Sequence, residues 1–331
     1  MRVRQLAKLM RPGEWAKNVF VLLALVFALP GRLAHGADVW PLIGHTALAF
    51  IAFYLLASGF CAINNVTDAP RDRKHPVKRK QPVASGAIAP GKTAGMGVVL
   101  IVAALLVAWA LNWLLVCTLL LYCLLQMLYN LQIKRVMLVN VVGLATGFAI
   151  RATAGPVAIE FSIWLLLCVF FLTLYLDFVK RLCDWSSAKP MDDNEWSSPA
   201  GYDDRIELNW LPGVSAVLAI VTCLMYALSD QSTAIFGSRA IDFALLTPLM
   251  MIAIHGSYRR STDGSSDSPL EALRDDRIVL AAIALFSTGV LVSLFVPQSP
   301  RLLDELYIVG ESRLVADTTS GPPRYDESSY E

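Results

Sequence analysis

Long apolar stretches alternate with short polar segments along most of this chain. The stretches fall at 18–35, 43–63, 94–111, 113–130, 137–156, 162–182, 208–229, 241–258 and 276–296. A helix of about 20 apolar residues crosses the hydrocarbon core of a bilayer. Very short links, at Asn112 and from Gly155 and Pro156 onward, force the spans that they join to run antiparallel. The pattern predicts an all-α, polytopic membrane bundle of about nine transmembrane helices.

The composition agrees with lipid as the main solvent. Of 331 residues, 56% are hydrophobic and 17% are charged, with a mean hydropathy of +0.54, whereas soluble domains carry about a quarter charged residues. The net charge of +1 indicates no nucleic-acid partner. The six cysteines lie in or beside apolar stretches without CxxC spacing, which favours buried thiols over a metal or disulfide framework.

Basic residues gather in alternate loops. Links that hold only Arg32, Arg239 or no basic residue separate the segments that are rich in Lys and Arg, which are the N-terminus, 64–93, 134–135, 180–207 and 259–275. Because basic loops stay in the cytoplasm, we expect a bacterial plasma-membrane protein with a cytoplasmic N-terminus and active site. An odd number of spans then leaves the C-terminus outside. The basic residues before 18–35 lead into a span, so no cleavable signal is expected.

We expect two parts of the chain to differ in character. Residues 1–296 would form the transmembrane catalytic domain, and 297–331 a polar, disordered tail with no assigned chemistry.

A polar cluster follows the second stretch, in the segment NNVTDAPRDRKHPVKRKQPVASG. Asn64, Asp68 and Asp72 are spaced by four and share one face if the helix continues through them. Their oxygens suit Mg²⁺ that is held together with substrate phosphates. The cations that follow would neutralise phosphate or simply touch anionic lipid in a cytoplasmic loop; they are Arg71, Arg73, Lys74, Lys78, Arg79 and Lys80. The cluster predicts a magnesium–diphosphate site at the membrane boundary.

Charged residues also occur within two later stretches. Arg151 lies in the apolar segment GFAIRATAG, where an arginine needs either a bound phosphate or an aspartate partner. Asp177, Lys180, Arg181 and Asp184 are spaced i, i+3, i+4 and i+7 and form one helical stripe. This stripe predicts either a second phosphate-binding surface or a ladder of ion pairs with no ligand.

The first cluster resembles the NDxxDxxxDrxHPxKxxRPiasG signature of the UbiA-type intramembrane prenyltransferases. Asn65 stands where the family has aspartate, and Gln81 where it has arginine. An asparagine at position 65 still offers an amide oxygen but brings no charge. The resemblance covers most of the chain and implies a magnesium-dependent transferase with nine membrane helices around a cavity that opens to the cytoplasm.

Three shorter segments resemble one branch of that family, the decaprenyl-phosphate phosphoribosyltransferases. They are RPGEWAKN at 11–18, similar to RPxQWxKN; YNLQIKR, similar to YSxxLK; and Lys180-Arg181 with Asp184, similar to KRxxE. Together with the residue patterns, the resemblance implies Mg²⁺ ligands Asn64, Asp68 and Asp72 and catalytic carboxylates Asp68, Asp72, Asp177 and Asp184. The substrate-binding residues would be Lys17, Asn65, Arg73, Lys78, Tyr129, Lys134, Arg151, Lys180 and Arg181.

The function expected from this resemblance is transfer of 5-phosphoribose from phosphoribosyl diphosphate to a decaprenyl-like polyprenyl phosphate, with release of pyrophosphate. The partners would be this lipid-linked phosphate, the phosphorylated donor and the surrounding lipid. One alternative is prenyl transfer from an isoprenyl diphosphate to an aromatic or quinone-precursor acceptor. Another is a diverged protein without catalysis or a transporter, although no pair of broken spans in matching halves supports transport. The sequence predicts no oligomeric state.

Overall fold

The computed structural model describes residues 19–34, 36–73, 78–131, 137–154, 162–188, 205–236, 240–262 and 276–295. Within these ranges all regular secondary structure is helical. The chain divides into two compact units, Met1–Leu294 and Phe295–Glu331, and the description below concerns the first of them.

Every predicted apolar stretch overlaps one long helix. These helices are α2 (Val19–Ala34), α3 (Trp40–Thr67), α5 (Pro90–Leu111), α6 (Trp113–Leu131), α7 (Met137–Ala152), α8 (Ile163–Ala188), α9 (Arg205–Ala227), α12 (Thr247–Thr262) and α14 (Arg277–Phe295). The short elements are α4 (Ala69–Asp72), the 3₁₀ turn η2 (Lys78–Lys80), α10 (Asp230–Phe236) and α11 (Ala240–Leu245). The predicted all-α membrane bundle is therefore confirmed.

Several helices have the length and surface that a bilayer requires. Among the described residues, 6 helices are long and apolar enough to cross a membrane, namely α3, α5, α6, α8, α9 and α14, and α2 and α7 contain shorter apolar segments. On α5, Leu106 and Trp109 are 64% and 79% exposed. Large apolar side chains that face outward in this way suit lipid rather than water.

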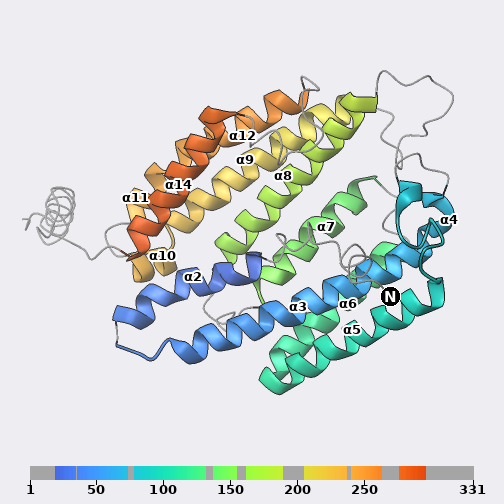
Figure 1. Cartoon of the computed structure of the whole chain (residues 1–331). Coiled ribbons are helices and arrows are strands. Elements are labelled where there is room, and N and C mark those ends of the chain that lie inside the picture. The colour runs from blue at the N-terminus through green and yellow to red at the C-terminus, as the bar shows by residue number, and fades with distance from the viewer. Residues whose placement is uncertain are drawn as a thin grey trace, which may run out of the picture. The chain divides into compact units, whose positions relative to one another are not determined.

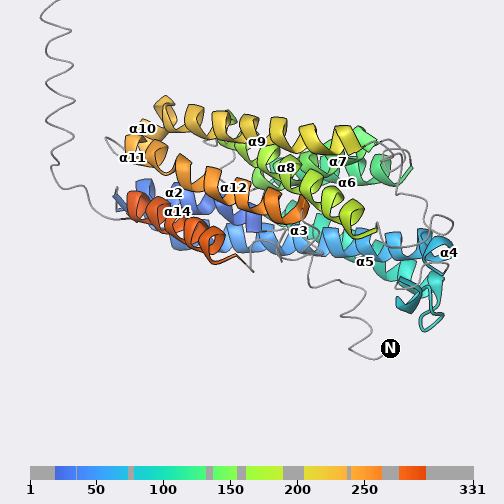
Figure 2. The ribbon, with the colours of Figure 1, turned by 90° about the horizontal axis from the view of Figure 1, so that it is seen from above.

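The helices pack side by side, and α8 packs against three of them. Helix α3 packs along α5, α8 along α9, and α7 along α8, and α12 lies against both α8 and α9. In two perpendicular views, α7 and α8 lie between α3 and α9 (Figures 1 and 2). Because α8 contacts neighbours on several sides, its successive faces belong to different parts of the bundle.

Glycines allow α3 and α5 to approach closely. A Cβ atom on Gly59 would lie 2.8 Å from the carbonyl oxygen of Gly97, and one on Gly97 would lie 2.9 Å from the carbonyl oxygen of Gly59. Small residues at a crossing let membrane helices pack backbone against backbone. This contact fixes α3 one to two turns before Asn64 and so positions the end of α3 that carries the first polar cluster.

Side-chain caps mark several helix ends. Asn112 ends α5, and its Oδ1 accepts a hydrogen bond from the backbone N–H of Leu115 at 2.7 Å, which begins α6. Asp276 precedes α14, and its carboxylate accepts the backbone N–H of Ile278 at 2.9 Å and Nε–H of Arg260 at 3.2 Å. The hydrogen bond from Ile278, with the help of Arg260, lowers the pKa of the Asp276 carboxyl below its ordinary value.

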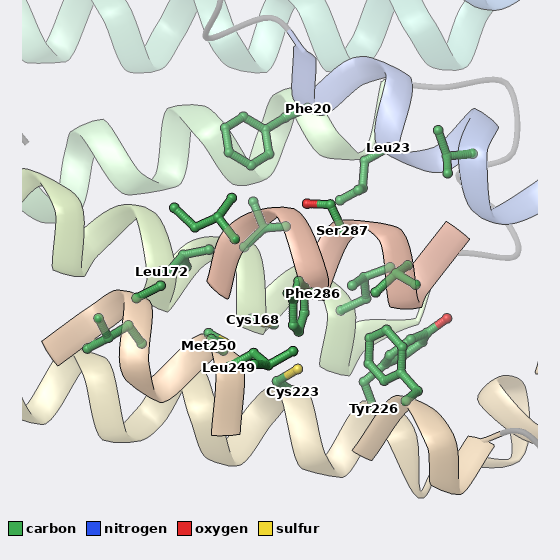
Figure 3. A pocket seen from close by; sticks show the side chains of 18 of the residues that line it. Phe20, Leu23, Cys168, Leu172, Cys223, Tyr226, Leu249, Met250, Phe286 and Ser287 are labelled. Carbon is green, nitrogen blue, oxygen red and sulfur yellow. The ribbon is translucent and has the colours of Figure 1, made fainter. Parts of the chain in front are cut away.

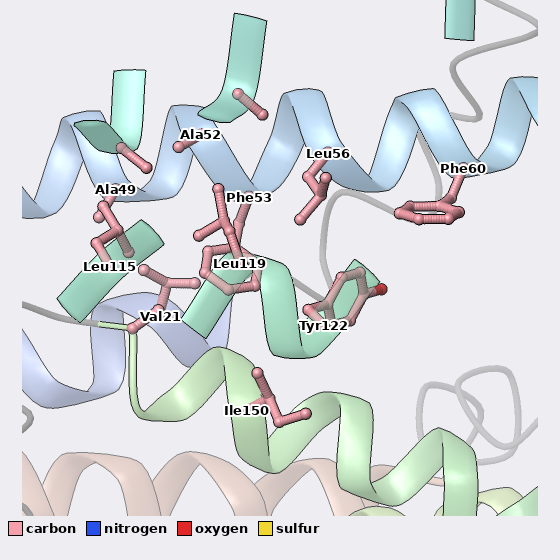
Figure 4. Packing of buried hydrophobic residues seen from close by; sticks show 13 residues of the cluster. Val21, Ala49, Ala52, Phe53, Leu56, Phe60, Leu115, Leu119, Tyr122 and Ile150 are labelled. Carbon is pink, nitrogen blue, oxygen red and sulfur yellow. The ribbon is translucent and has the colours of Figure 1, made fainter. Parts of the chain in front are cut away.

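A hydrophobic cluster joins α2, α3, α5, α6 and α7 (Figure 4). Phe53, Leu56 and Leu119 are fully buried in it, and the ring of Tyr122 meets that of Phe53 edge to face at 5.7 Å between centroids. Phe60 and Tyr122 also belong to the lining of a polar cavity. Through these two residues the cluster is continuous with the lining of that cavity.

Candidate functional site

A polar cavity of about 270 Å³ lies between α3, α6, α7 and α8. We call it the polar cavity. Its lining includes a group of side chains that the sequence had marked as site residues: Asn64, Tyr129, Arg151, Asp177, Lys180 and Arg181. The first polar cluster, the buried arginine and the stripe on α8 therefore meet at one place, although they are far apart in the sequence.

The first cluster keeps helical register past the end of α3. The N–H of Asp68 donates to the carbonyl of Asn64 at 2.8 Å, and that of Asp72 donates to the carbonyl of Asp68 at 2.9 Å. Because these bonds are of the i to i−4 type, Asn64, Asp68 and Asp72 follow one another along one helical face. Asn64 reaches the polar cavity, whereas Asp68 is half-buried beyond its described lining and Asp72 is buried.

Arg151 is held on α7 by aromatic side chains from two helices. One of its terminal nitrogens donates to the hydroxyl of Tyr122. The guanidinium carbon lies 5.0 Å from the ring centroid of Tyr122 and 5.2 Å from that of Phe148, within range of cation–π attraction. Gln126 also donates to the Tyr122 hydroxyl, at 2.5 Å. In the described structure no aspartate holds Arg151, and its buried Nε has no hydrogen-bond partner.

A second set of contacts joins α6, α7 and α8. The Tyr129 hydroxyl donates to Oδ1 of Asn140 at 3.0 Å, and a terminal nitrogen of Arg181 lies 3.5 Å from the same oxygen. Tyr129 of α6 and Arg181 of α8 therefore meet at the side-chain amide of Asn140 on α7.

The residues around Asn64 fit a magnesium ion that is shared with a substrate phosphate. Oδ1 of Asn64 is buried and accepts no hydrogen bond from any described residue. Such an oxygen, with the carboxylates of Asp68 and Asp72 on the same face, suits a hard cation. Across the described ranges, no three His, Cys, Asp or Glu side chains gather as a metal cage.

Other predicted site residues lie elsewhere around the end of α3. Asn65 is buried and lies outside the described lining of the polar cavity. Arg73 is exposed, and its Nε donates to the carbonyl of Ala84 at 3.3 Å, which ties it to the loop before α5. Lys17 and Lys134 lie outside the described residues. Lys78 and Asp184 fall on η2 and α8, but their side chains are also outside the described part.

The cavity contains polar residues that the sequence reasoning did not select. Tyr122 and Gln126 line the cavity from α6, and Asn140 supports it from α7. Each is a polar residue inside an apolar stretch, and this signal alone could have marked Gln126 and Asn140. Phe148 carried no such signal, since an aromatic residue in a membrane helix is ordinary.

A larger, apolar cavity of about 550 Å³ lies between α2, α8, α9, α11, α12 and α14. We call it the apolar cavity. Figure 3 shows side chains from these helices, among them Phe20, Leu172 and Phe286, around a common space. The hydroxyl of Tyr175, which belongs to this lining, donates to the backbone carbonyl of Ile254 at 2.6 Å. Tyr175 and Asp177 therefore lie on different faces of α8, one toward the apolar cavity and the other toward the polar cavity.

Comparisons with known proteins give a consistent result. The UbiA prenyltransferase family model matches residues 24–273. A decaprenyl-phosphate phosphoribosyltransferase of Mycobacterium tuberculosis is 29% identical over 290 residues, which cover 86% of this chain and 93% of that protein. The enzyme of the same name from Corynebacterium glutamicum is 32% identical over 242 residues, 68% of each chain. A solved UbiA homolog from Archaeoglobus fulgidus, bound to GPP and Mg²⁺, has a TM-score of 0.61 at 18% identity and covers 87% of this chain and 99% of that one, a likeness of fold.

Proposed function

Because this chain belongs to the UbiA prenyltransferase family, we propose that it transfers 5-phosphoribose from phosphoribosyl diphosphate to a polyprenyl phosphate and releases pyrophosphate. The curated relatives that match most of its length carry the name of this activity. The apolar helices and the family together make it an integral membrane transferase.

The observation that carries the proposal is the number of cations in the polar cavity. Arg151, Lys180 and Arg181 line the same cavity as Asn64. A ribose donor has a 5-phosphate several bonds from its diphosphate, so it presents anionic groups at two ends. The α3 oxygens would receive the diphosphate end, and the cations of α7 and α8 the other phosphates. An isoprenyl diphosphate would instead place an apolar tail against these charges, which is costly.

Asn64, Asp68 and Asp72 would hold the magnesium ion of the donor diphosphate. Bound there, Mg²⁺ would neutralise the charge that grows on the departing pyrophosphate. Tyr129, whose hydroxyl shares Oδ1 of Asn140 with Arg181, would hold α6 and α8 in position at the site. Lys17, Lys134 and Lys78 would add cations at the cytoplasmic mouth, and Asp177 and Asp184 would supply carboxylates from α8.

The reaction requires one bond to form and one to break. An oxygen of the lipid phosphate attacks C1 of the ribose, and the bond from C1 to the pyrophosphate oxygen breaks, so that pyrophosphate leaves with the bonding electrons. The lipid phosphate is already anionic near neutral pH and needs no strong general base. Rate acceleration would come from positioning and from charge stabilisation in a site that excludes water. The apolar cavity would receive part of the lipid chain.

The loops that carry this site would face the cytoplasm. The segments 64–93 and 180–207 each hold several Lys and Arg residues, as cytoplasmic segments do. This orientation gives the site access to a water-soluble, phosphorylated donor, while the lipid acceptor arrives from within the bilayer.

The proposal is tested by pyrophosphate release from the purified protein. We expect release from phosphoribosyl diphosphate only when a polyprenyl phosphate and Mg²⁺ are present. Lys180→Ala should raise the KM for phosphoribosyl diphosphate by about tenfold or more, because a charge-assisted phosphate contact is lost, with little change in the KM for the lipid. Lys92→Ala, which removes an exposed lysine of α5 outside the described cavity lining, is the matched control. Turnover of an isoprenyl diphosphate with an aromatic acceptor, and none with the ribose donor, would select the prenylation reaction instead.

A further inference from the structure

An aromatic contact between two described residues joins the linings of the two cavities. Phe20 of α2 lines the apolar cavity, and Phe148 of α7 lines the polar cavity. Their rings meet edge to face, with 5.4 Å between centroids and an interplanar angle of 74°. Figure 3 shows the ring of Phe20 at the border of the apolar cavity. The pair therefore stands where an apolar chain in one cavity would continue toward the polar groups of the other.

The other part of the partition is helix α8. It presents Tyr175 and Leu176 to the apolar cavity and Asp177 to the polar cavity. Its backbone hydrogen bonds and its packing against α7 and α9 hold it in place. Aromatic side chains, in contrast, change rotamer without breaking backbone hydrogen bonds. The partition thus has two parts, helix α8 and the ring pair of Phe20 and Phe148. The ring pair is the part that is able to move.

Phe148 also packs against the guanidinium of Arg151. The centroid of its ring lies 5.2 Å from the guanidinium carbon, and the same ring meets that of Phe20. The buried Nε of Arg151 has no hydrogen-bond partner among the described residues. If Phe148 rotates away from Phe20, it leaves the guanidinium as well, and an anion is able to take its place with a stronger, charge-assisted hydrogen bond.

We propose that Phe20 and Phe148 form a gate that admits the phosphate of a lipid from the apolar cavity to Arg151, and that Phe148 is a specificity-determining residue for the lipid acceptor. The inference rests on the proposed use of a polyprenyl phosphate. In the closed gate the ring of Phe148 covers Arg151. In the open gate the lipid chain occupies the space between the two rings, and its phosphate replaces the ring as the partner of Arg151. A dissolved phosphate that enters from the aqueous side does not pass between Phe20 and Phe148.

The test measures lipid binding without any ribose donor, so that failure of ribose transfer leaves the result readable. The probes are radiolabelled decaprenyl phosphate and the water-soluble dimethylallyl phosphate, each added to the purified full-length protein, with inorganic phosphate as a third ligand. Phe20→Leu removes the ring contact but leaves Phe148 against Arg151. We expect association with decaprenyl phosphate to become about 2- to 10-fold faster, because one edge-to-face contact no longer favours the closed gate. Binding of dimethylallyl phosphate and of inorganic phosphate should change less than about twofold.

Phe148→Leu gives a second, different expectation. It removes both the ring contact and the cation–π contact, so association with decaprenyl phosphate should quicken and binding of dimethylallyl phosphate should also strengthen by about twofold or more. Phe286→Leu is the control, since Phe286 lines the apolar cavity and packs against Phe243 instead. Unchanged association in Phe20→Leu, an equal increase in Phe286→Leu, or an equal response of the short and long ligands to Phe20→Leu would each overturn the gate. Wild-type protein that binds no lipid phosphate would overturn it too.

Discussion

Oδ1 of Asn64 and Nε of Arg151 are buried polar atoms of the site that have no hydrogen-bond partner among the described residues. A buried polar atom that makes no hydrogen bond costs about 1–3 kcal/mol. Both residues line the polar cavity, one from α3 and the other from α7. A bound magnesium ion and a bound phosphate would satisfy these atoms, so the stability that the free protein gives up would be recovered when substrates bind.

Asp68 and Asp72, which follow Asn64 on the same helical face, should determine how much magnesium the reaction requires. Asp68→Asn or Asp72→Asn should lower turnover by about 100-fold or more and raise the magnesium concentration needed for half-maximal activity, because a carboxylate ligand becomes neutral. Pyrophosphate release measured across a magnesium titration gives both quantities. Asp230→Asn, at an exposed position that starts α10, should behave as wild type. A variant at Asp68 or Asp72 with an unchanged magnesium requirement would remove that aspartate from the ion.

The sequence located several site residues but not their surroundings. Spacing by four placed Asn64, Asp68 and Asp72 on one helical face, and the structure keeps that register. The sequence predicted that Arg151 binds either a phosphate or an aspartate. Among the described residues, Tyr122 and Phe148 contact its guanidinium. Tyr122 is 29 residues away in the sequence, and no local pattern encodes which face of α6 will meet α7.

At the scale of helices, the crossing of α3 and α5 depends on Gly59 and Gly97. Gly59→Ala should destabilise the protein by about 1–3 kcal/mol, because the new methyl group meets a backbone oxygen that moves only if the two helices separate. Thermal unfolding in detergent measures the change, and activity should fall as well because Asn64 follows on the same helix. Gly44→Ala is the matched control within α3, since nothing lies within 4 Å of its Cβ position. Equal midpoints for the two variants would contradict a tight crossing.

Helix positions were predicted more reliably than helix ends. The stretch 43–63 lies within α3 (Trp40–Thr67), and the stretch 162–182 begins one residue before α8 (Ile163–Ala188). Both helices continue past the stretch into polar residues. Hydropathy marks the part of a helix that sits in hydrocarbon, whereas backbone hydrogen bonds continue beyond it. These polar extensions carry predicted site residues: Asn64 and Asn65 lie in the last turn of α3, and Asp184 lies near the end of α8.

For the whole molecule, the testable property is its orientation in the membrane. A membrane-impermeant maleimide should label Ala37→Cys in intact bacterial cells, and should label Ser85→Cys only after the cells are made permeable. Ala37 is an exposed residue of the link between α2 and α3, which holds no Lys or Arg. Ser85 is exposed within the segment 64–93, which holds several Lys and Arg residues. Wild-type protein controls for the native cysteines. Labelling of both variants in intact cells would contradict a cytoplasmic site.

The separation of the two cavities by α8 has a consequence for inhibitor design. An apolar compound that fills only the apolar cavity, about 550 Å³ in volume, would compete with the lipid and leave the ribose donor free to bind. A small, multiply charged compound in the polar cavity would do the opposite. A single molecule with an anionic head and an apolar arm joined past Phe20 and Phe148 would exclude both substrates at once, and its affinity would profit from the linkage because the second half binds without a new loss of translational freedom.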